Sequence, residues 1–303
     1  AIIVFTICLK LVLSPLEILQ RVSSQKQSRV MAVIQPEINA LQEKYKNDRE
    51  KLNQETNKLY KKYKVNVGGM CITMLVTMAI SLIVLFTLYS SIRSYGTEKL
   101  YTTYQELDNA YIAAESEYST LTDTDLTQEE YIDQAIILKY DELGKQNSWL
   151  WIKNVWKSDT NTSQFVEFDD YADHFNLEGE DRELAKARYD SITSTIVGDG
   201  KDNNGYYLII IFAVLVSFLT QFLSTKLLAP KGQKMNLTNK IMMAVIPITM
   251  LILAMTSNVV FTLYISTNSV MAAIISTIIS LVLRRINKGK NDKDILMKSR
   301  NIE

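Results

Sequence analysis

The sequence predicts an all-α, polytopic membrane protein: a five-helix transmembrane bundle with a cytoplasmic helical hairpin and a helical extracytoplasmic domain. Two observations support this prediction. Residues 206–224 and 241–283 form stretches of 19 and 43 residues without a charge, whereas residues 91–205 carry 24 acidic and 10 basic side chains. Uncharged apolar stretches of about 18 residues or more are typical of transmembrane helices. The average composition, with 47% hydrophobic residues and a net charge of +0, conceals this division.

Hydropathy and charge give the order of the parts along the chain. We expect a first span at 1–22, a cytoplasmic hairpin at 23–66, a second span at 67–90, an acidic extracytoplasmic domain at 91–205, a third span at 206–224, a cytoplasmic loop at 225–240, fourth and fifth spans at 241–283 and a basic cytoplasmic tail at 284–303. Because the first span starts at residue 1, further residues are expected upstream.

The stretch 241–283 is too long for one span. As a single helix it would measure about 64 Å, roughly twice the ~30 Å hydrocarbon thickness. We therefore expect it to turn back at Thr256, Ser257 and Asn258, and we expect Pro247 to kink the fourth span.

The charges of the loops predict the orientation. Residues 21–65 carry a net charge of +6, residues 225–240 carry four basic and no acidic residues, residues 284–303 carry +4, and residues 91–205 carry −14. Positively charged loops stay on the cytoplasmic side of a membrane. The three basic segments alternate correctly across five spans, so the start of the chain is expected outside and its tail inside.

Two parts outside the spans show helical patterns. Residues 23–66 predict two antiparallel helices joined by a turn at 46–49, because apolar side chains recur there at three- and four-residue steps: Val30, Ile34, Ile38, Leu41 and Tyr45 in the first half, then Leu52, Leu59 and Tyr63. The basic surface of this hairpin suits either a solvated coiled coil or contact with a ribosome, an anionic lipid surface or a nascent chain.

The acidic domain at 91–205 is long enough to fold by itself. Leu100, Tyr104, Leu107 and Tyr111 predict one helix. Thr127 and Glu130 form a capping box that opens a second, Gly144 is expected to close it, and 180–196 is a third candidate. The cluster of Trp149, Trp151 and Trp156 suits either an amphipathic segment at the membrane interface or packing against the helical domain.

The sequence contains few residues for metal or redox chemistry. Cys8 and Cys71 lie in apolar stretches and are expected to be small buried thiols, and the one histidine, His174, is expected on the surface. A lone histidine is a poor zinc site, and no P-loop, GxGxxG, GxSxG or HExxH motif is present. We therefore expect no metal, no cofactor and no enzymatic activity.

Lys10 is the unusual residue of the first span. A cation inside an apolar helix costs about 2.5–3.5 kcal/mol on insertion scales, so it must face protein or water, or reach the interface. In one interpretation Lys10 extends to the cytoplasmic headgroups. In the other it faces a water-filled groove together with Thr6, one turn earlier on the same side. The further candidates for this groove, each of which could instead bridge helices by a hydrogen bond, are Thr77, Ser217, Gln221, Ser266 and Asn268.

Several short motifs resemble the YidC-type membrane protein insertases, relatives of the mitochondrial and chloroplast insertases. The run KLVLSPL at 10–16 is similar to the family's Arg-x-x-x-x-Pro-Leu at the end of its first core span. The run IQPE at 34–37 and the residues at 59–66 resemble the family's cytoplasmic hairpin, GGMC at 68–71 its entry to the next span, and KIMMAVIP at 240–247 the opening of its fourth span. The chain departs from the pattern at Lys10, where the family usually has Arg, at Val67 and Ala79 in place of Pro, and at 256–258 in place of a Pro- and Gly-containing turn. The departures indicate a divergent paralogue.

The resemblance implies a membrane insertase or chaperone. Such a protein would receive hydrophobic segments of nascent proteins in a hydrophilic groove and release them into the bilayer of a bacterial cell membrane, without nucleotide. It also implies a positive residue in that groove, which corresponds to Lys10. The implied partners are nascent membrane proteins and lipid, with a ribosome and a Sec translocon as further candidates and no nucleic acid beyond ribosome contact. The alternative is a non-catalytic assembly or adaptor protein whose acidic outer domain recruits an envelope partner.

Overall fold

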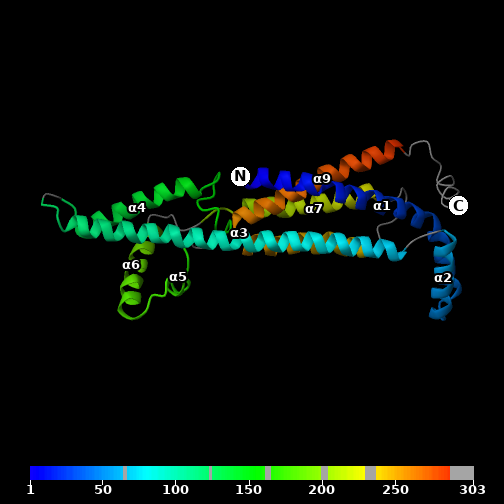
Figure 1. Ribbon diagram of the computed structural model, residues 1–303, viewed down its shortest axis with the longest axis horizontal. Helices are drawn as coiled ribbons and strands as arrows, with labels where there is room; N and C mark the ends of the chain where they lie inside the picture. Colours follow the sequence, from blue (N-terminus) through cyan, green and yellow to red (C-terminus); the bar gives the residue numbers. More distant parts are fainter. Residues whose placement is uncertain (64–66, 123–124, 161–164, 199–203, 229–236, 287–303) are drawn as a thin grey trace. The chain divides into compact units, whose positions relative to one another are not determined.

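The computed structural model describes six stretches of the chain: 1–63, 67–122, 125–160, 165–198, 204–228 and 237–286. Helices dominate these residues and no strand occurs in them, which confirms the predicted all-α class (Figure 1). They divide into two compact units. The first holds the described residues of Ala1–Phe86, Leu215–Ile248 and Tyr264–Glu303, and the second holds those of Thr87–Val214 and Thr249–Leu263.

Helix α1 joins the first apolar stretch to the hairpin without a break. It runs over Ile2–Lys44, 43 residues, with Pro15 and Pro36 inside it. The sequence between the span and the hairpin stripe contains no Gly or Pro, so no residue there stops the helix. The expected border between 1–22 and 23–66 is therefore a change of environment along one helix.

The predicted hairpin forms at the end of α1. After the cap residue Tyr45 the chain turns, and the Asp48 carboxylate accepts the Lys51 backbone N–H at 3.0 Å to open α2, Arg49–Lys62. The two helices pack through a small buried core: Ile34, Ile38, Leu59 and Tyr63. The Tyr63 hydroxyl donates to Glu37 Oε1 at 2.5 Å, which links the end of α2 to α1.

Helix α3 is likewise longer than expected. It covers Val67–Tyr118, 52 residues, so the second apolar stretch and the first predicted helix of the acidic domain are one element. Its length of about 78 Å exceeds the ~30 Å hydrocarbon thickness. A single helix therefore carries the chain from an apolar environment into the acidic domain.

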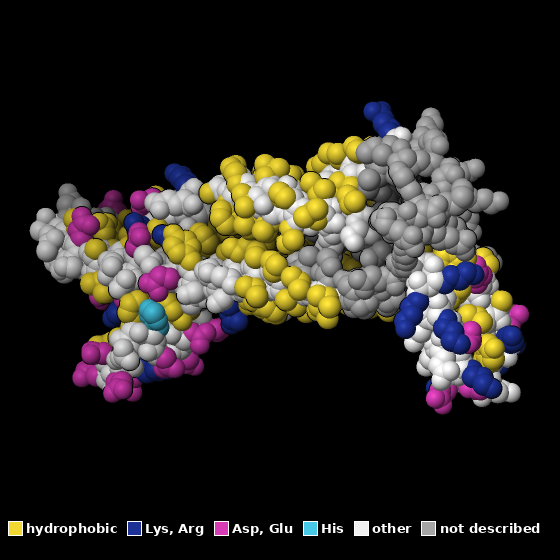
Figure 2. Space-filling model, turned by 45° about the vertical axis from the view of Figure 1, so that its right-hand side comes forward, with side chains coloured by type: hydrophobic (Ala, Val, Ile, Leu, Met, Phe, Trp, Pro, Cys, Tyr) yellow, Lys and Arg dark blue, Asp and Glu magenta, His cyan; other side chains and the backbone are white. Residues whose placement is uncertain are grey.

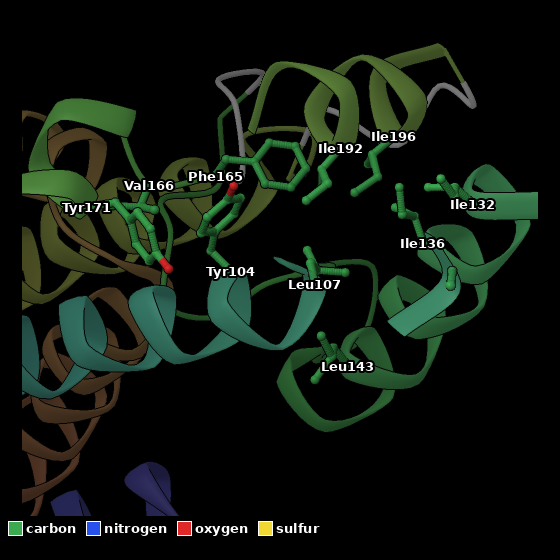
Figure 3. Packing of buried hydrophobic residues seen from close by; sticks show 11 residues of the cluster. Tyr104, Leu107, Ile132, Ile136, Leu143, Phe165, Val166, Tyr171, Ile192 and Ile196 are labelled. Carbon is green, nitrogen blue, oxygen red and sulfur yellow. The ribbon is translucent and has the colours of Figure 1, made fainter. Parts of the chain in front are cut away.

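The acidic domain has its own hydrophobic core (Figure 3). Tyr104 and Leu107 of α3 meet Ile136 of α4, Gln128–Asn147, and Ile192 of α6, Gly179–Gly198. Both α4 and α6 occur where the sequence predicts helices. The short helix α5, Phe168–His174, packs on α6 and has no counterpart among the predictions.

The caps of α4 confirm one prediction and correct another. Thr127 Oγ1 accepts the Glu130 backbone N–H, and the Glu130 carboxylate accepts the Thr127 N–H at 2.8 Å, which completes the predicted capping box. Gly144, expected to end the helix, lies in its last turn instead. The helix ends at Asn147, and the Gly144 carbonyl accepts the N–H of Ser148. Gly144 has no positive φ, so it is not the left-handed cap residue that ends many helices.

The tryptophan cluster forms a folded loop. Trp149 and Ile152 exchange two backbone hydrogen bonds, at 3.0 and 2.9 Å. The Trp156 indole donates to Asn147 Oδ1 at 3.1 Å and packs edge-on against Tyr95 at 5.2 Å. For Trp156, the expected packing against the helical domain is therefore confirmed.

Buried polar groups attach this loop to the start of α7, Leu208–Leu228. The Asp159 carboxylate, almost fully buried, accepts the backbone N–H groups of Tyr207 at 3.1 Å and Ile209 at 2.7 Å. The Asn204 side-chain amide donates to the carbonyls of Asn154 and Ser158. Asp159 thus satisfies donors that would otherwise be unpaired at the first turn of an apolar helix.

Among the residues that the structure describes, three helices are long and apolar enough to cross a membrane by length and composition. Their apolar segments are Ile2–Gln20 in α1, Met78–Tyr118 in α3 and Val259–Val282 in α9, Val259–Ile286. Shorter apolar helical segments occur at Leu208–Leu223 and at Met243–Thr256, within α7 and α8, Leu237–Thr256. The protein is thus an all-α, multi-pass membrane protein. The gap between α8 and α9 falls at Ser257 and Asn258, where the sequence predicts the turn.

Candidate functional site

Lys10 lies on the protein-facing side of α1. Its side chain is only 8% exposed, and its Nζ forms an ion pair with Glu17 Oε1. Seven residues are nearly two full turns of an α-helix, so both side chains lie on one face. Thr6, one turn before Lys10, is also buried, and its hydroxyl donates to the Ile2 carbonyl at 2.7 Å.

The opposite side of α1 is apolar and open. Val4, Phe5, Leu11 and Val12 are all exposed, Val12 to 76%. In a membrane this is the face that suits lipid, while the polar stripe of Thr6, Lys10 and Glu17 is turned toward protein. The division explains how one apolar helix can hold a cation.

Cys8 belongs to the exposed face and corrects the expectation of two buried thiols. A thiol behaves as a small apolar group, so it can lie on a face that suits lipid without being buried in protein. The side chain of Cys71 lies outside the described residues. His174 is exposed as predicted and stacks on Tyr101 at 4.3 Å between ring centres.

The remaining predicted groove residues divide into three groups. Ser217 and Ser266 are buried, Gln221 and Asn268 are half-buried, and the side chain of Thr77 lies outside the described residues. Within the part of the chain that the structure describes, the buried Ser217 hydroxyl has no hydrogen-bond partner.

Helices α7 and α9 approach one another near these residues. The Thr220 hydroxyl donates to the Ser269 carbonyl at 3.4 Å, which places polar atoms of the two helices together. Two more buried hydroxyls of α9, Ser276 and Ser280, were not among the predicted residues. Their four-residue spacing, which puts them on one helix face, is the signal that could have found them.

Glu17 is the site residue that the sequence reasoning missed. Its spacing from Lys10 was available as a signal, since side chains seven residues apart share a helix face. An ammonium held by a carboxylate at the edge of an apolar segment can exchange that carboxylate for another anionic group. The chemistry that this arrangement supports is reversible binding. Among the described residues, no three His, Cys, Asp or Glu side chains lie together as a metal site.

Charged side chains gather on two other parts of the chain (Figure 2). The surface of the hairpin in this view carries mainly Lys and Arg, many of them on α2. The surface around α5 and α6 carries mainly Asp and Glu. Each surface keeps the charge sign that its segment has in the sequence.

The family model and the curated relatives that match this chain point to the same family. The model of the family described as "60Kd inner membrane protein" matches residues 1–286. Three curated relatives named "Membrane protein insertase YidC" are 42% identical over 93 residues in Clostridium tetani, 41% over 95 residues in Caldanaerobacter subterraneus subsp. tengcongensis and 47% over 88 residues in Clostridium perfringens.

The relatives match only part of the chain. The aligned residues make up 31%, 31% and 29% of this chain and 40%, 42% and 34% of the respective relatives. The chain therefore aligns with less than half the length of each of these curated relatives. The family model, in contrast, covers α1 to α9. The chain belongs to the 60Kd inner membrane protein family, the family of the YidC-type insertases.

Proposed function

We propose that the protein is a membrane protein insertase that works without nucleotide, cofactor or covalent catalysis. A nascent hydrophobic segment places its polar flank beside Lys10, and the apolar part moves into lipid. Transfer of apolar surface out of water supplies about 0.8 kcal/mol per buried methylene group, so a segment of several apolar residues gains enough free energy to insert.

The burial of Lys10 is the observation that carries this proposal. The ammonium is sheltered by protein and paired with Glu17, while the outer face of the same helix is apolar. A sheltered positive charge attracts an acidic flank and reduces the cost of taking that flank partway into the membrane. Buried hydroxyls of α7 and α9, among them Ser217 and Ser266, are suited to line a hydrophilic groove with it.

Substrate delivery belongs to the hairpin in this proposal. Its basic surface would lie in the cytoplasm, where it can meet a ribosome, the Sec translocon or an emerging chain. The proposed setting is a bacterial cell membrane crossed five times, by the expected spans 1–22, 67–90, 206–224 and the pair in 241–283, with the C-terminus in the cytoplasm.

The test is insertion of a single-span reporter with an acidic flank in cells depleted of their own insertase. Lys10→Ala is expected to lower insertion at least about tenfold, in line with loss of a charge-assisted contact. Lys10→Arg, which keeps the charge, is expected to retain it. Full insertion by the Lys10→Ala protein at equal membrane abundance would exclude a role for the charge.

A further inference from the structure

A cavity of about 410 Å³ lies within the second unit, apart from Lys10. Helix α3 contributes Tyr89 and Arg93 to its walls, and the tryptophan loop contributes Trp156 and Lys157. The junction of α8 and α9 contributes Ser257 and Phe261. Cavities of this size are typical of small-molecule and headgroup sites.

The cavity lies at the border of apolar chain segments. The apolar segment Met243–Thr256 of α8 ends at it, and the segment Val259–Val282 of α9 begins beside it. In the expected span order, 67–90 ends there too, between Tyr89 and Arg93. Segments of this kind end where hydrocarbon gives way to headgroups.

Hydrogen bonds hold the three walls together. The loop carbonyls of Lys157 and Val155 accept the N–H groups of Val259, at 2.9 Å, and Val260, at 3.2 Å. Asn258 Nδ2 donates to the Ile92 carbonyl of α3 at 3.4 Å. The cavity is therefore built from fixed backbone, and little ordering is needed when a ligand binds.

The charge of the lining has one sign. Arg93 and Lys157 bring two cations, and no Asp or Glu is among the described lining residues. Burial lowers the pKa of Lys157, and the negative charges of Glu167 and Asp170 oppose this shift only in part. An anion in the cavity would compensate the desolvated ammonium.

Ser257 also lines the cavity and carries a buried hydroxyl. The residue is 5% exposed, and among the described residues its hydroxyl has no hydrogen-bond partner. A buried hydroxyl without a partner costs free energy unless a ligand accepts its hydrogen. Tyr89 and Phe261, packed edge-on at 5.0 Å, add an apolar wall beside the polar groups.

We propose that Arg93, Lys157 and Ser257 bind a phosphate group, with the apolar wall receiving the organic part of a phosphate ester. Two cations and a hydroxyl match the acceptor oxygens of phosphate. A lipid headgroup and free phosphate share this chemistry, and they are separated by the choice of probe.

The experiment measures binding to the full-length protein in a nonionic detergent by isothermal titration. The probes are dihexanoylphosphatidylglycerol, inorganic phosphate and dihexanoylglycerol, which lacks phosphate. Binding of the phospholipid alone identifies a lipid headgroup, and binding of inorganic phosphate as well identifies a general phosphate site. Arg93→Gln and Lys157→Gln are each expected to weaken binding by about tenfold or more.

Two further variants complete the test. Lys99→Gln is the matched control, since Lys99 also lies on α3 but does not line the cavity, and it is expected to bind as the unaltered protein does. Ser257→Ala removes a hydroxyl with no described partner, so the fold is expected to persist while binding falls severalfold. The proposal is overturned if neither phosphate probe binds, if the phosphate-free lipid binds equally well, or if all four variants bind alike.

Discussion

Two ion pairs of this chain, one in the acidic domain and one in helix α1, have different consequences. Arg188 of α6 donates to both oxygens of Asp108 on α3, at 2.6 and 3.1 Å, and joins residues 80 positions apart. Lys10 and Glu17 are seven positions apart on one helix. The first pair breaks when the domain unfolds. The second can persist in an isolated helix, so it contributes little to holding helices together. The comparison indicates that the Arg188–Asp108 pair stabilises the fold of the acidic domain, whereas the Lys10–Glu17 pair contributes little to tertiary structure.

The largest expected effect on stability comes from breaking the Arg188–Asp108 pair. In the unaltered protein, the Asp108 carboxylate raises the pKa of the Arg188 guanidinium. Asp108→Asn removes this negative charge and leaves the half-buried guanidinium without an anionic partner. We expect a loss of about 2–3 kcal/mol, below the ~3–5 kcal/mol of fully buried pairs because both side chains keep some exposure. Hydrogen exchange of α6 amides, followed by mass spectrometry on the full chain, measures it.

A control for this variant is available on the same helix. Arg182 bonds to Asp169 and Asp173, whose side chains are mostly in water. Arg182→Gln should therefore change α6 protection only slightly. Equal loss of protection in the two variants would contradict the structural role given to Asp108.

The next effect concerns the buried carboxylate that holds the start of α7. A Cβ added at Gly205 would overlap Asp159 Oδ1 and come within 2.9 Å of Ile152 Cδ1. Gly205→Ala is expected to destabilise the second unit by about 1–3 kcal/mol. Gly144→Ala is the matched control, because nothing lies within 4 Å of its new Cβ and Ala favours a helix over Gly by about 0.8–1.0 kcal/mol. The midpoint of thermal unfolding, followed by circular dichroism, should fall for Gly205→Ala and rise for Gly144→Ala.

A smaller effect is expected at the α4 capping box. Thr127→Ala should cost about 1 kcal/mol, measured as faster exchange of the first α4 amides. The backbone N–H and hydroxyl of Thr127 lower the pKa of Glu130. The contribution of the Glu130 carboxylate to the stability of α4 is therefore complete above the ordinary pKa of Glu. It is lost as the pH falls through the lowered pKa of the folded protein. Protection of the first α4 amides that does not change when the pH is lowered from 7 until the Glu130 carboxylate is protonated would contradict a role for this carboxylate.

The smallest change in stability is expected for Glu17→Gln. Its partner lies on the same helix, so the thermal unfolding midpoint should shift less than for Asp108→Asn. Insertion of a reporter with an acidic flank should rise severalfold, since a competitor for the Lys10 ammonium is gone. A reporter with a neutral flank is the control, and an equal rise for both reporters would show that Glu17 does not compete with an acidic group.

Local signals in the sequence predicted local features well. The stripe that includes Ile34 and Ile38 predicted the hairpin, and Thr127 with Glu130 predicted the start of α4. The sequence did not predict that α1 and α3 each continue as one long helix. In both, the residues change from apolar to polar, which resembles the end of a helix even though the backbone stays helical. Helix α5 was missed since seven residues give too short a periodic pattern.

The candidate site was predictable only in part. Lys10 stands out because a cation is costly in an apolar helix, and the burial of Thr6 and Ser217 follows from their polarity in an apolar setting. Glu17 lies within the expected first span, 1–22, but it was overlooked because only Thr6, one turn away, was compared with Lys10. The cavity of Arg93, Lys157 and Ser257 depends on contacts between segments more than 60 positions apart, which no local pattern encodes.

Disulfide trapping between α1 and a stalled nascent chain shows which side of α1 a substrate meets. Thr6→Cys places a thiol on the protein-facing side beside Lys10, and Val12→Cys places one on the open apolar side, both in a background with Cys8→Ser and Cys71→Ser. The substrate carries one cysteine in its polar flank. We expect trapping from position 6 and not from position 12, and trapping from position 12 alone would show that the substrate does not meet the polar side of α1.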